Sequence, residues 1–226
     1  MIEFYGGYQV YSESGIDLTL LRENLKRTET ERLRKNQRML PLIEELRRSG
    51  RVKSPGELQQ IRRTGMVEPE ALLRQLVEYQ VEFVMIGGLA MVVHGSAHIT
   101  EDLDVCYSRT QKNIAALAGA LAPLHPYLRG APPGLPFHFD IPTIQAGLNF
   151  TLISDFGELD VLGEVTGIGK YEQALAQSEE KTVYGLKVPV LSLDALLVSK
   201  RAAGRIKDRN HILELEELKK MRGESS

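Results

Sequence analysis

Residues 81–107, which are VEFVMIGGLAMVVHGSAHITEDLDVCY, contain the strongest indications of the fold. It opens with a short, β-branched apolar run that ends at Gly87 and Gly88, which predicts a buried strand. The next segment, LAMVVHG at 89–95, is compatible with a helix, and LDVCY at 103–107 again predicts a strand. A strand, a glycine pair, a helix and a second strand in this order favour a mixed α/β unit.

The glycine pair has two interpretations. Glycine between a strand and a helix lets the backbone approach a ligand, and the helix then offers unpaired N–H groups and a positive dipole end to an anion such as a triphosphate. The alternative is a tight strand-to-helix turn that requires a positive φ. Taken alone, Gly87 and Gly88 fit the turn better, so the interpretation depends on the residues that follow them.

Asp102 and Asp104 follow, and they alternate with the apolar residues Leu103 and Val105. Side chains two apart on a strand point to the same face, roughly 6.5–7 Å apart. Both carboxylates are therefore expected on one face, while the aliphatic side chains enter the core. Neighbouring carboxylates repel one another unless a cation lies between them, and oxygen ligands of this kind suit Mg²⁺ or Mn²⁺.

A third acid occurs in ELDVL, residues 158–162. Asp160 is expected on an outward face of this strand, with Leu159 and Val161 pointing inward. Three carboxylates on two neighbouring strands are the minimum needed to bridge two divalent ions about 3.5–4 Å apart. Taken alone, however, Asp160 also fits an ordinary amphipathic strand with a solvated acid.

Helices and strands alternate around these motifs through residues 66–226. Pro69 is well placed to begin a helix, and residues 155–157 predict the turn of a hairpin. The expected helices are 69–79, 111–124, 170–177, 193–203 and 206–221, and the further expected strands are 149–154, 158–163, 181–184 and 187–191. The alternation predicts an α+β domain, or mixed α/β domain, over residues 66–226.

Residues 1–65 are expected to form an N-terminal helical extension. Thr28 and Glu31 form a capping box that begins a helix, and Pro41 is expected to split or kink it. The many interleaved charges of this helix predict a solvated arm. Nucleic-acid binding and self-association or partner docking are the alternatives, the latter through the apolar residues Leu33, Leu40, Ile43 and Leu46.

The composition narrows the class of protein. The chain has 226 residues, 42% of them hydrophobic and 26% charged, which excludes a collagen-like or wholly disordered protein. No apolar run approaches the roughly 18 residues of a membrane span, and the first residues lack the features of a signal peptide. The single cysteine, Cys106, can form no internal disulfide. These features predict a cytoplasmic protein without a membrane partner.

The net charge of −2 conceals an uneven distribution. Residues 100–165 contain eight acidic and three basic residues, whereas residues 199–209 contain five basic residues and one acidic residue. Acids beside a basic helix suit metal ions and a polyphosphate. Lys200 and Lys207 are the candidates for neutralising a triphosphate or steering a nucleic acid. The alternative is a solvated helix surface with pairs to Asp208 inside the helix.

The motifs together resemble a known family. Gly87-Gly88 is followed after thirteen residues by Asp102-Leu103-Asp104-Val105 and later by Leu159-Asp160-Val161. This arrangement resembles the polymerase-beta nucleotidyltransferase superfamily, and most closely its small members grouped with the AbiEii toxin type. The runs at 155–163 and 191–208 are also similar to that group, and the resemblance covers about residues 68–218.

The resemblance implies a fold, an activity and a set of site residues. The fold would be the mixed sheet flanked by helices of small nucleotidyltransferases, and the enzyme would move an NMP from an NTP to a hydroxyl on tRNA, a protein or a small molecule. Gly87 and Gly88 would bind the phosphates through backbone N–H groups. Asp102, Asp104 and Asp160 would hold two Mg²⁺ or Mn²⁺ ions, and Asp160 would also help to deprotonate the acceptor.

The sequence departs from the family pattern at one position. Many relatives have Gly-Ser where this chain has Gly87-Gly88, so Ser96 or Thr100 would have to supply a hydroxyl contact to phosphate. The AbiEii likeness also implies a toxin–antitoxin component with an antitoxin partner. A catalytically idle nucleotidyltransferase-like binding module, or an antitoxin-type partner, is the alternative function.

Overall fold

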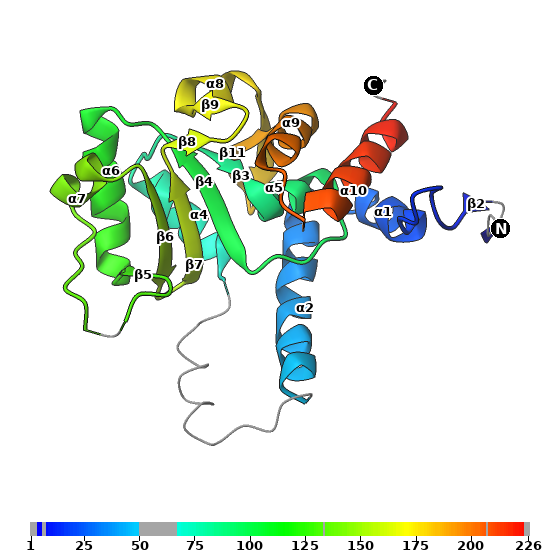
Figure 1. Ribbon diagram of the computed structural model, residues 1–226, viewed down its shortest axis with the longest axis horizontal. Helices are drawn as coiled ribbons and strands as arrows, with labels where there is room; N and C mark the ends of the chain where they lie inside the picture. The colour runs from blue at the N-terminus through cyan, green and yellow to red at the C-terminus, as the bar shows by residue number, and fades with distance from the viewer. Residues whose placement is uncertain (1–3, 6–7, 50–66, 133, 207, 224–226) are drawn as a thin grey trace.

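A mixed β-sheet forms the centre of the molecule (Figure 1). The structure, a computed structural model, describes residues 4–5, 8–49, 67–132, 134–206 and 208–223. Within these residues the sheet has seven strands in the order β10-β11-β3-β4-β7-β6-β5. Neighbours are antiparallel except at β11–β3 and β4–β7, which are parallel. The strands are β3 (Phe83–Ile86), β4 (Asp102–Tyr107), β5 (Tyr127–Leu128), β6 (Asn149–Ser154), β7 (Gly157–Leu162), β10 (Ser178–Val183) and β11 (Leu186–Leu191).

The register of the middle strands places the acids side by side. β4 and β7 run parallel, with Asp102 beside Glu158 and Asp104 beside Asp160. β6 and β7 form the hairpin predicted at 155–157. The predicted fold class, a mixed sheet flanked by helices, is confirmed.

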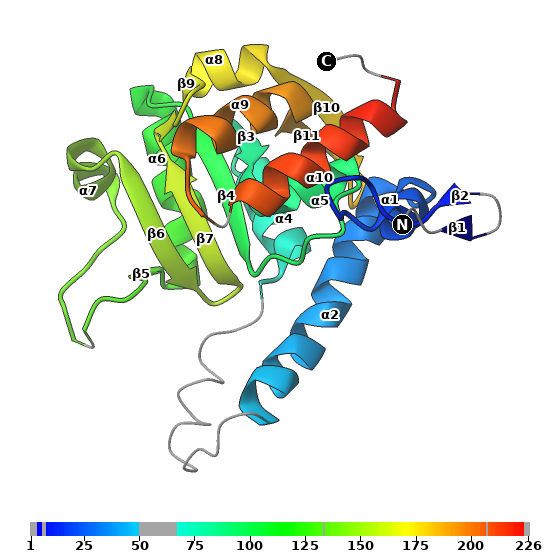
Figure 2. The same cartoon turned by 45° about the vertical axis from the view of Figure 1, so that its right-hand side comes forward.

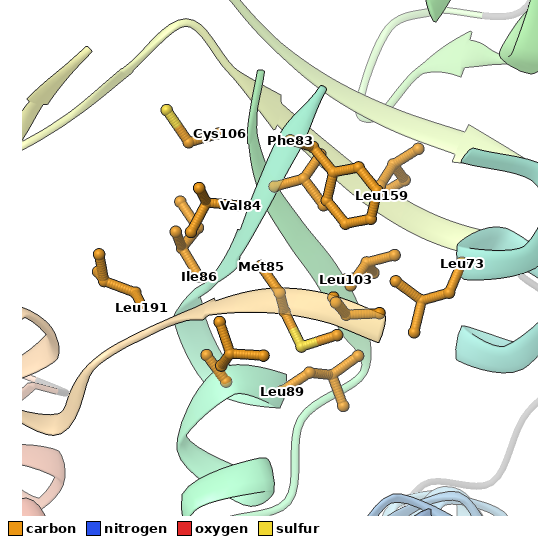
Figure 3. Close-up of a cluster of buried hydrophobic side chains, with 14 of the residues drawn as sticks. Leu73, Phe83, Val84, Met85, Ile86, Leu89, Leu103, Cys106, Leu159 and Leu191 are labelled. Atoms are coloured by element: carbon orange, nitrogen blue, oxygen red, sulfur yellow. The ribbon is translucent and has the colours of Figure 1, made fainter. Parts of the chain in front are cut away.

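The two faces of the sheet are covered differently, because alternate side chains of a strand point in opposite directions. On one face, Phe83, Leu103 and Leu159 gather beside Leu73 of the helix over residues 69–78 (Figure 3). Cys106 lies on the other side of the same strands, and it is also buried. The acids of β4 and β7 project from this second face, where they are only partly buried. The main core therefore lies behind the acids and supports them.

Helices flank both faces (Figures 1 and 2). α4 and α6 contact one another on one side of the sheet, while α8 and α9 lie on the other side and α10 packs along α9. The helices are α1 (Leu18–Leu25), α2 (Glu29–Ser49), α4 (Pro69–Glu78), α5 (Gly87–His94), α6 (Gln111–Leu121), α7 (Ile141–Ala146), α8 (Tyr171–Ala176), α9 (Leu193–Ala203) and α10 (Asp208–Met221), with a short 3₁₀ helix η1 (Ala122–Leu124). Two small two-stranded sheets pair β1 (Phe4–Tyr5) with β2 (Tyr8–Gln9) and β8 (Glu164–Val165) with β9 (Gly169–Lys170).

The N-terminal helices are packed against the sheet domain rather than solvated along their whole length. The predicted capping box is present, because the backbone N–H of Thr28 donates to the Glu31 carboxylate at 2.8 Å and the N–H of Glu31 donates to the Thr28 hydroxyl at 3.3 Å. Leu21 and Leu33 are fully buried, and α2 packs against α5. The expectation of a solvated arm is therefore wrong for α1 and the first half of α2, because apolar residues of both helices belong to the buried core. The second half of α2 projects from the molecule (Figure 1).

Three further expectations concern the ends of elements. Pro41 lies inside α2 and does not end this helix. The basic stretch 199–209 is not a single helix, because Gly204 takes a φ of 62° and ends α9. The expected division near residue 65 lies outside the described residues and stays a prediction. Among the described residues, no helix combines the length and apolarity that crossing a membrane requires.

Candidate active site

Three carboxylates converge on the partly open face of the sheet. Asp102 and Asp104 project from β4 and Asp160 projects from β7, because the parallel register puts these strands side by side. One oxygen from each carboxylate lies within 4.8 Å of an oxygen from each of the others. A donor set made only of oxygen atoms fits Mg²⁺ or Mn²⁺. The predicted convergence of the three acids is confirmed, while their role as ligands stays a prediction.

The glycine pair brings the start of α5 directly against one of these acids. Gly87 has a φ of 66°, so the turn interpretation is confirmed. A Cβ atom at Gly87 would lie 1.9 Å from Oδ2 of Asp104, which leaves no room for any other residue. The backbone N–H of Gly88 donates a hydrogen bond to the Asp104 carboxylate. In this structure the helix terminus therefore binds the acid itself.

Thr100 supplies a hydroxyl group beside Gly88. A Cβ atom at Gly88 would lie 2.4 Å from the Thr100 hydroxyl, which donates to Oδ1 of Asp102 at 2.8 Å. The Thr100 backbone is held from α2, because Asn36 donates to its carbonyl at 2.8 Å and accepts from its N–H at 3.0 Å. Of the two hydroxyl residues considered from the sequence, Thr100 lies at the acids.

The structure adds a positively charged side chain, Arg129, that was not predicted at this cluster. Arg129 follows the edge strand β5, and its guanidinium binds Glu158 and donates to Oδ1 of Asp160 at 2.6 Å. The same guanidinium lies 3.8 Å from Oδ2 of Asp102. Glu158 is thus a fourth acid on this face, two residues before Asp160 on β7. Arg129 lies 31 residues from Asp160 in the sequence, so no local pattern could have indicated the contact.

Two acids of the cluster, Asp104 and Asp160, have raised pKa values. Burial, together with the charges of Asp102 and Asp160, raises the pKa of Asp104 to about 8. Burial also raises the pKa of Asp160, although Arg129 opposes that rise. Carboxylates that repel one another are expected to remain protonated until a cation compensates their charge. The electrostatics of the cluster therefore favour a bound cation.

A pocket of about 450 Å³ opens beside the acids. Asp104, Asp160 and Gly87 line part of it, and Lys200 and Arg205 line another part. Its volume lies within the range of small-molecule sites, which is roughly 300–1,000 Å³. A pocket with carboxylates and cations in its wall can accept a metal ion together with a phosphorylated ligand.

The two cations of the pocket are held by one buried acid. Asp208, at the start of α10, accepts from Nε of Arg205 at 2.7 Å and from Nζ of Lys200 at 3.3 Å. Asp208 is fully buried and Lys200 is only 9% exposed. The interpretation of Lys200 as part of a solvated helix surface is therefore wrong, because the turn at Gly204 folds α10 back onto this lysine.

Ser96 and Lys207 are two further predicted binding residues, and the structure describes only Ser96. Ser96 follows the left-handed Gly95 at the far end of α5, and it is buried away from the pocket lining. Its hydroxyl accepts from the backbone N–H of His98 at 3.0 Å. Lys207 lies outside the described residues.

Comparison with known proteins gives fold-level likenesses only. No protein-family model matches the sequence, and no curated protein matches it. The chain is similar to the solved structure of the lincosamide antibiotic adenylyltransferase LnuA with lincomycin bound, at 17% identity and a TM-score of 0.44, over 68% of this chain and 99% of the other. It is also similar to a protein from Thermotoga maritima described as a "putative nucleotidyltransferase", at 17% identity and a TM-score of 0.40, over 71% of this chain and 98% of the other. At these TM-scores neither likeness carries any part of the assignment below.

Proposed function

We propose that this chain is a metal-dependent nucleotidyltransferase that moves an NMP from an NTP to a hydroxyl acceptor. The observation that carries the proposal is the convergence of Asp102, Asp104 and Asp160, two of which, Asp104 and Asp160, line one pocket. Lys200 in the same pocket supplies positive charge for a triphosphate. The sequence resemblance described above supports the same reaction.

Each residue at the site has a separate role in the proposed transfer reaction. The acceptor oxygen forms a bond to the α-phosphorus, the bond from that phosphorus to the bridging oxygen of the β-phosphate breaks, and pyrophosphate leaves. The acceptor proton passes to the carboxylate of Asp160. Lys200 and Arg205 hold the departing phosphates. Mg²⁺ or Mn²⁺ on Asp102, Asp104 and Asp160 would supply charge stabilisation when bound.

The direct test is transfer of a radiolabelled NMP by the full-length chain with Mg²⁺ or Mn²⁺. Asp104→Asn is expected to lower the rate at least about 100-fold, since a catalytic metal ion supplies several kcal/mol and each 1.4 kcal/mol is a factor of ten. Asp194→Asn is the matched control, because Asp194 is itself exposed and does not line the pocket. Wild-type transfer by Asp104→Asn would disprove the assignment of the acids.

The proposal also covers the identity of the acceptor and the biological role of the reaction. Parallel assays with tRNA, with the chain itself and with small hydroxylated molecules identify the acceptor by the labelled product. The AbiEii resemblance leads us to propose a toxin role, in which expression of the wild-type chain arrests growth and expression of Asp104→Asn does not. An antitoxin partner would relieve that arrest.

A second candidate function is a catalytically idle module that binds nucleotide without turnover. The contact between Arg129 and Asp160 favours it, because a guanidinium already occupies one of the acids. Calorimetric titration with NTP, with and without Mg²⁺, separates the two candidates when combined with the transfer assay. Metal-dependent NTP binding without a labelled product on any acceptor would favour the idle module.

A further inference from the structure

Arg129 reaches the acidic cluster along a row of residues that crosses four neighbouring strands. Its backbone N–H donates to the carbonyl of Thr151 on β6 at 2.9 Å, which extends the β5–β6 pairing by one residue. Thr151 pairs with Asp160 on β7, and Asp160 pairs with Asp104 on β4. The register of the sheet therefore places the backbone of Arg129 in the same row as Asp160 and Asp104.

The contacts of Arg129 match those of a cation bound to the cluster. Its guanidinium bridges Glu158 and Asp160, which are two apart on β7 and share a face. The forked shape of a guanidinium suits two carboxylates at this spacing. The side chain of Asp160 is only 16% exposed and that of Arg129 is 28% exposed, so water screens the pair only in part.

We propose that Arg129 occupies the position of a second cation at the cluster and limits the resting site to one divalent ion. The proposal rests on the metal site of the proposed function. Asp102 and Asp104 offer carboxylate oxygens to one ion, because the guanidinium lies 3.8 Å from Asp102. An ion on Asp160 instead competes with the guanidinium for a carboxylate oxygen that it binds at 2.6 Å. Because the two cations repel one another at this range, the second ion binds only when Arg129 leaves Asp160.

The test is Mn²⁺ binding to the full-length chain, with free Mn²⁺ measured by electron paramagnetic resonance and heats measured by calorimetry. Wild type is expected to bind one ion well and a second ion weakly. Arg129→Gln removes the charge, and its second Mn²⁺ is expected to bind at least tenfold more tightly than in wild type. Arg129→Lys keeps the charge without the fork, so its second Mn²⁺ is expected to bind more weakly than in Arg129→Gln.

Arg201→Gln is the matched control. It makes the same change at an exposed arginine of α9 that pairs with Glu216 at 2.7 Å and does not line the pocket. Its Mn²⁺ binding is expected to equal that of wild type, so a general effect of lost positive charge is separated from the contact with Asp160.

A measurement on the wild-type chain covers the case in which Arg129→Gln does not fold. The side-chain Nε–H signal of Arg129 in ¹⁵N NMR, assigned by its loss in Arg129→Lys, is expected to shift as Mg²⁺ exceeds one equivalent. An unmoved signal, or equal Mn²⁺ binding by wild type and Arg129→Gln, would overturn the role of Arg129 alone. Absence of Mn²⁺ binding in every variant would overturn the role together with the metal site. Expected Mn²⁺ binding without NMP transfer would overturn only the transferase proposal.

Discussion

Gly88 shows how closely α5 approaches the acidic cluster. The space that a side chain would need at this position is filled by the hydroxyl and the Cβ atom of Thr100, at 2.4 and 2.7 Å. Thr100 in turn donates to Asp102. A serine at position 88 would compete with Thr100 for the same volume, so the hydroxyl beside the acids comes from Thr100 in this chain.

Gly88→Ala is expected to lower the free energy of unfolding by about 1–3 kcal/mol, because the added methyl group overpacks a filled site. Urea denaturation followed by circular dichroism measures the change. Gly119→Ala is the matched control, since Gly119 also lies in a helix and its nearest neighbour is the half-exposed ring of Tyr79 at 3.3 Å. Equal stability of Gly88→Ala and wild type would contradict the close contact with Thr100.

Single residues were predictable from the sequence where the signal was local. The alternation of acids and aliphatic residues identified Asp102, Asp104 and Asp160, because a strand repeats every two residues. Arg129 was counted only as a charge, since its contact with Asp160 depends on the pairing of β5, β6 and β7. Pairing between distant strands leaves no periodic trace in one sequence.

At the scale of elements, the turn between α9 and α10 builds one wall of the pocket. Gly204 ends α9, and Asp208 at the start of α10 then binds Lys200 and Arg205, both of which line the pocket. Burial opposes ionisation of Asp208, but Arg205 and Lys200 outweigh it and lower its pKa to about 2. This acid is therefore ionised at neutral pH, and its charge fixes the two cations.

Asp208→Asn is expected to weaken both the fold and the binding of a triphosphate. Removing one member of a buried ion pair leaves an uncompensated charge and costs about 3–5 kcal/mol, reduced here because Lys200 borders an open pocket. Urea denaturation measures the stability, and calorimetric titration with an NTP measures the affinity. Asp194→Asn, which breaks a pair whose acid is exposed, serves as the control and is expected to change stability by much less and NTP affinity not at all.

The ends of helices and strands could be predicted from the sequence where a cap or a turn depends on neighbouring residues. The capping box at Thr28 and the hairpin at 155–157 were both predictable, because each depends on residues within a few positions of one another. The pairs of Asp208 were expected inside one helix and instead join two. The sequence contained Gly204, but it did not show that the chain would reverse there.

At the scale of the whole molecule, His94 links three parts of the chain. Its Nε2–H donates to the carbonyl of Leu191 on β11 at 2.8 Å, which leaves Nδ1 as the acceptor facing the guanidinium of Arg222 at 3.4 Å. His94 is fully buried. Burial, with a further contribution from Arg222, lowers the pKa of His94 to about 4.

Protonation of His94 is expected to destabilise the whole fold in acid. An unfolded histidine has a pKa near 6.5, so between about pH 6.5 and pH 4 the unfolded chain binds more protons than the native chain. Stability is therefore lost as the pH falls through this window, by up to roughly 3 kcal/mol from this residue. The measurement is the free energy of unfolding against pH for wild type and His94→Gln, whose profile is expected to be flatter. His125→Gln, at an exposed histidine, is expected to keep the wild-type profile.

The relation between the N-terminal helices and the sheet domain could not be predicted from composition. Interleaved charges indicated a solvated arm, yet Asn24, Arg32 and Asn36 are almost fully buried. Each of them bonds to backbone groups around the end of α5 and the loop before β4. Polar side chains that satisfy another segment's backbone look the same in a sequence as polar side chains that face water.

The two hydrogen bonds between Asn36 and Thr100 have a practical consequence for anyone shortening this chain. Deleting residues 1–65 would seem to spare every acidic residue of the pocket, yet it would remove the only described side chain that grips both backbone groups of Thr100. If such a truncated protein failed to bind metal, displacement of Thr100 would be a sufficient explanation. The failure would not show whether the missing helices contact the substrate.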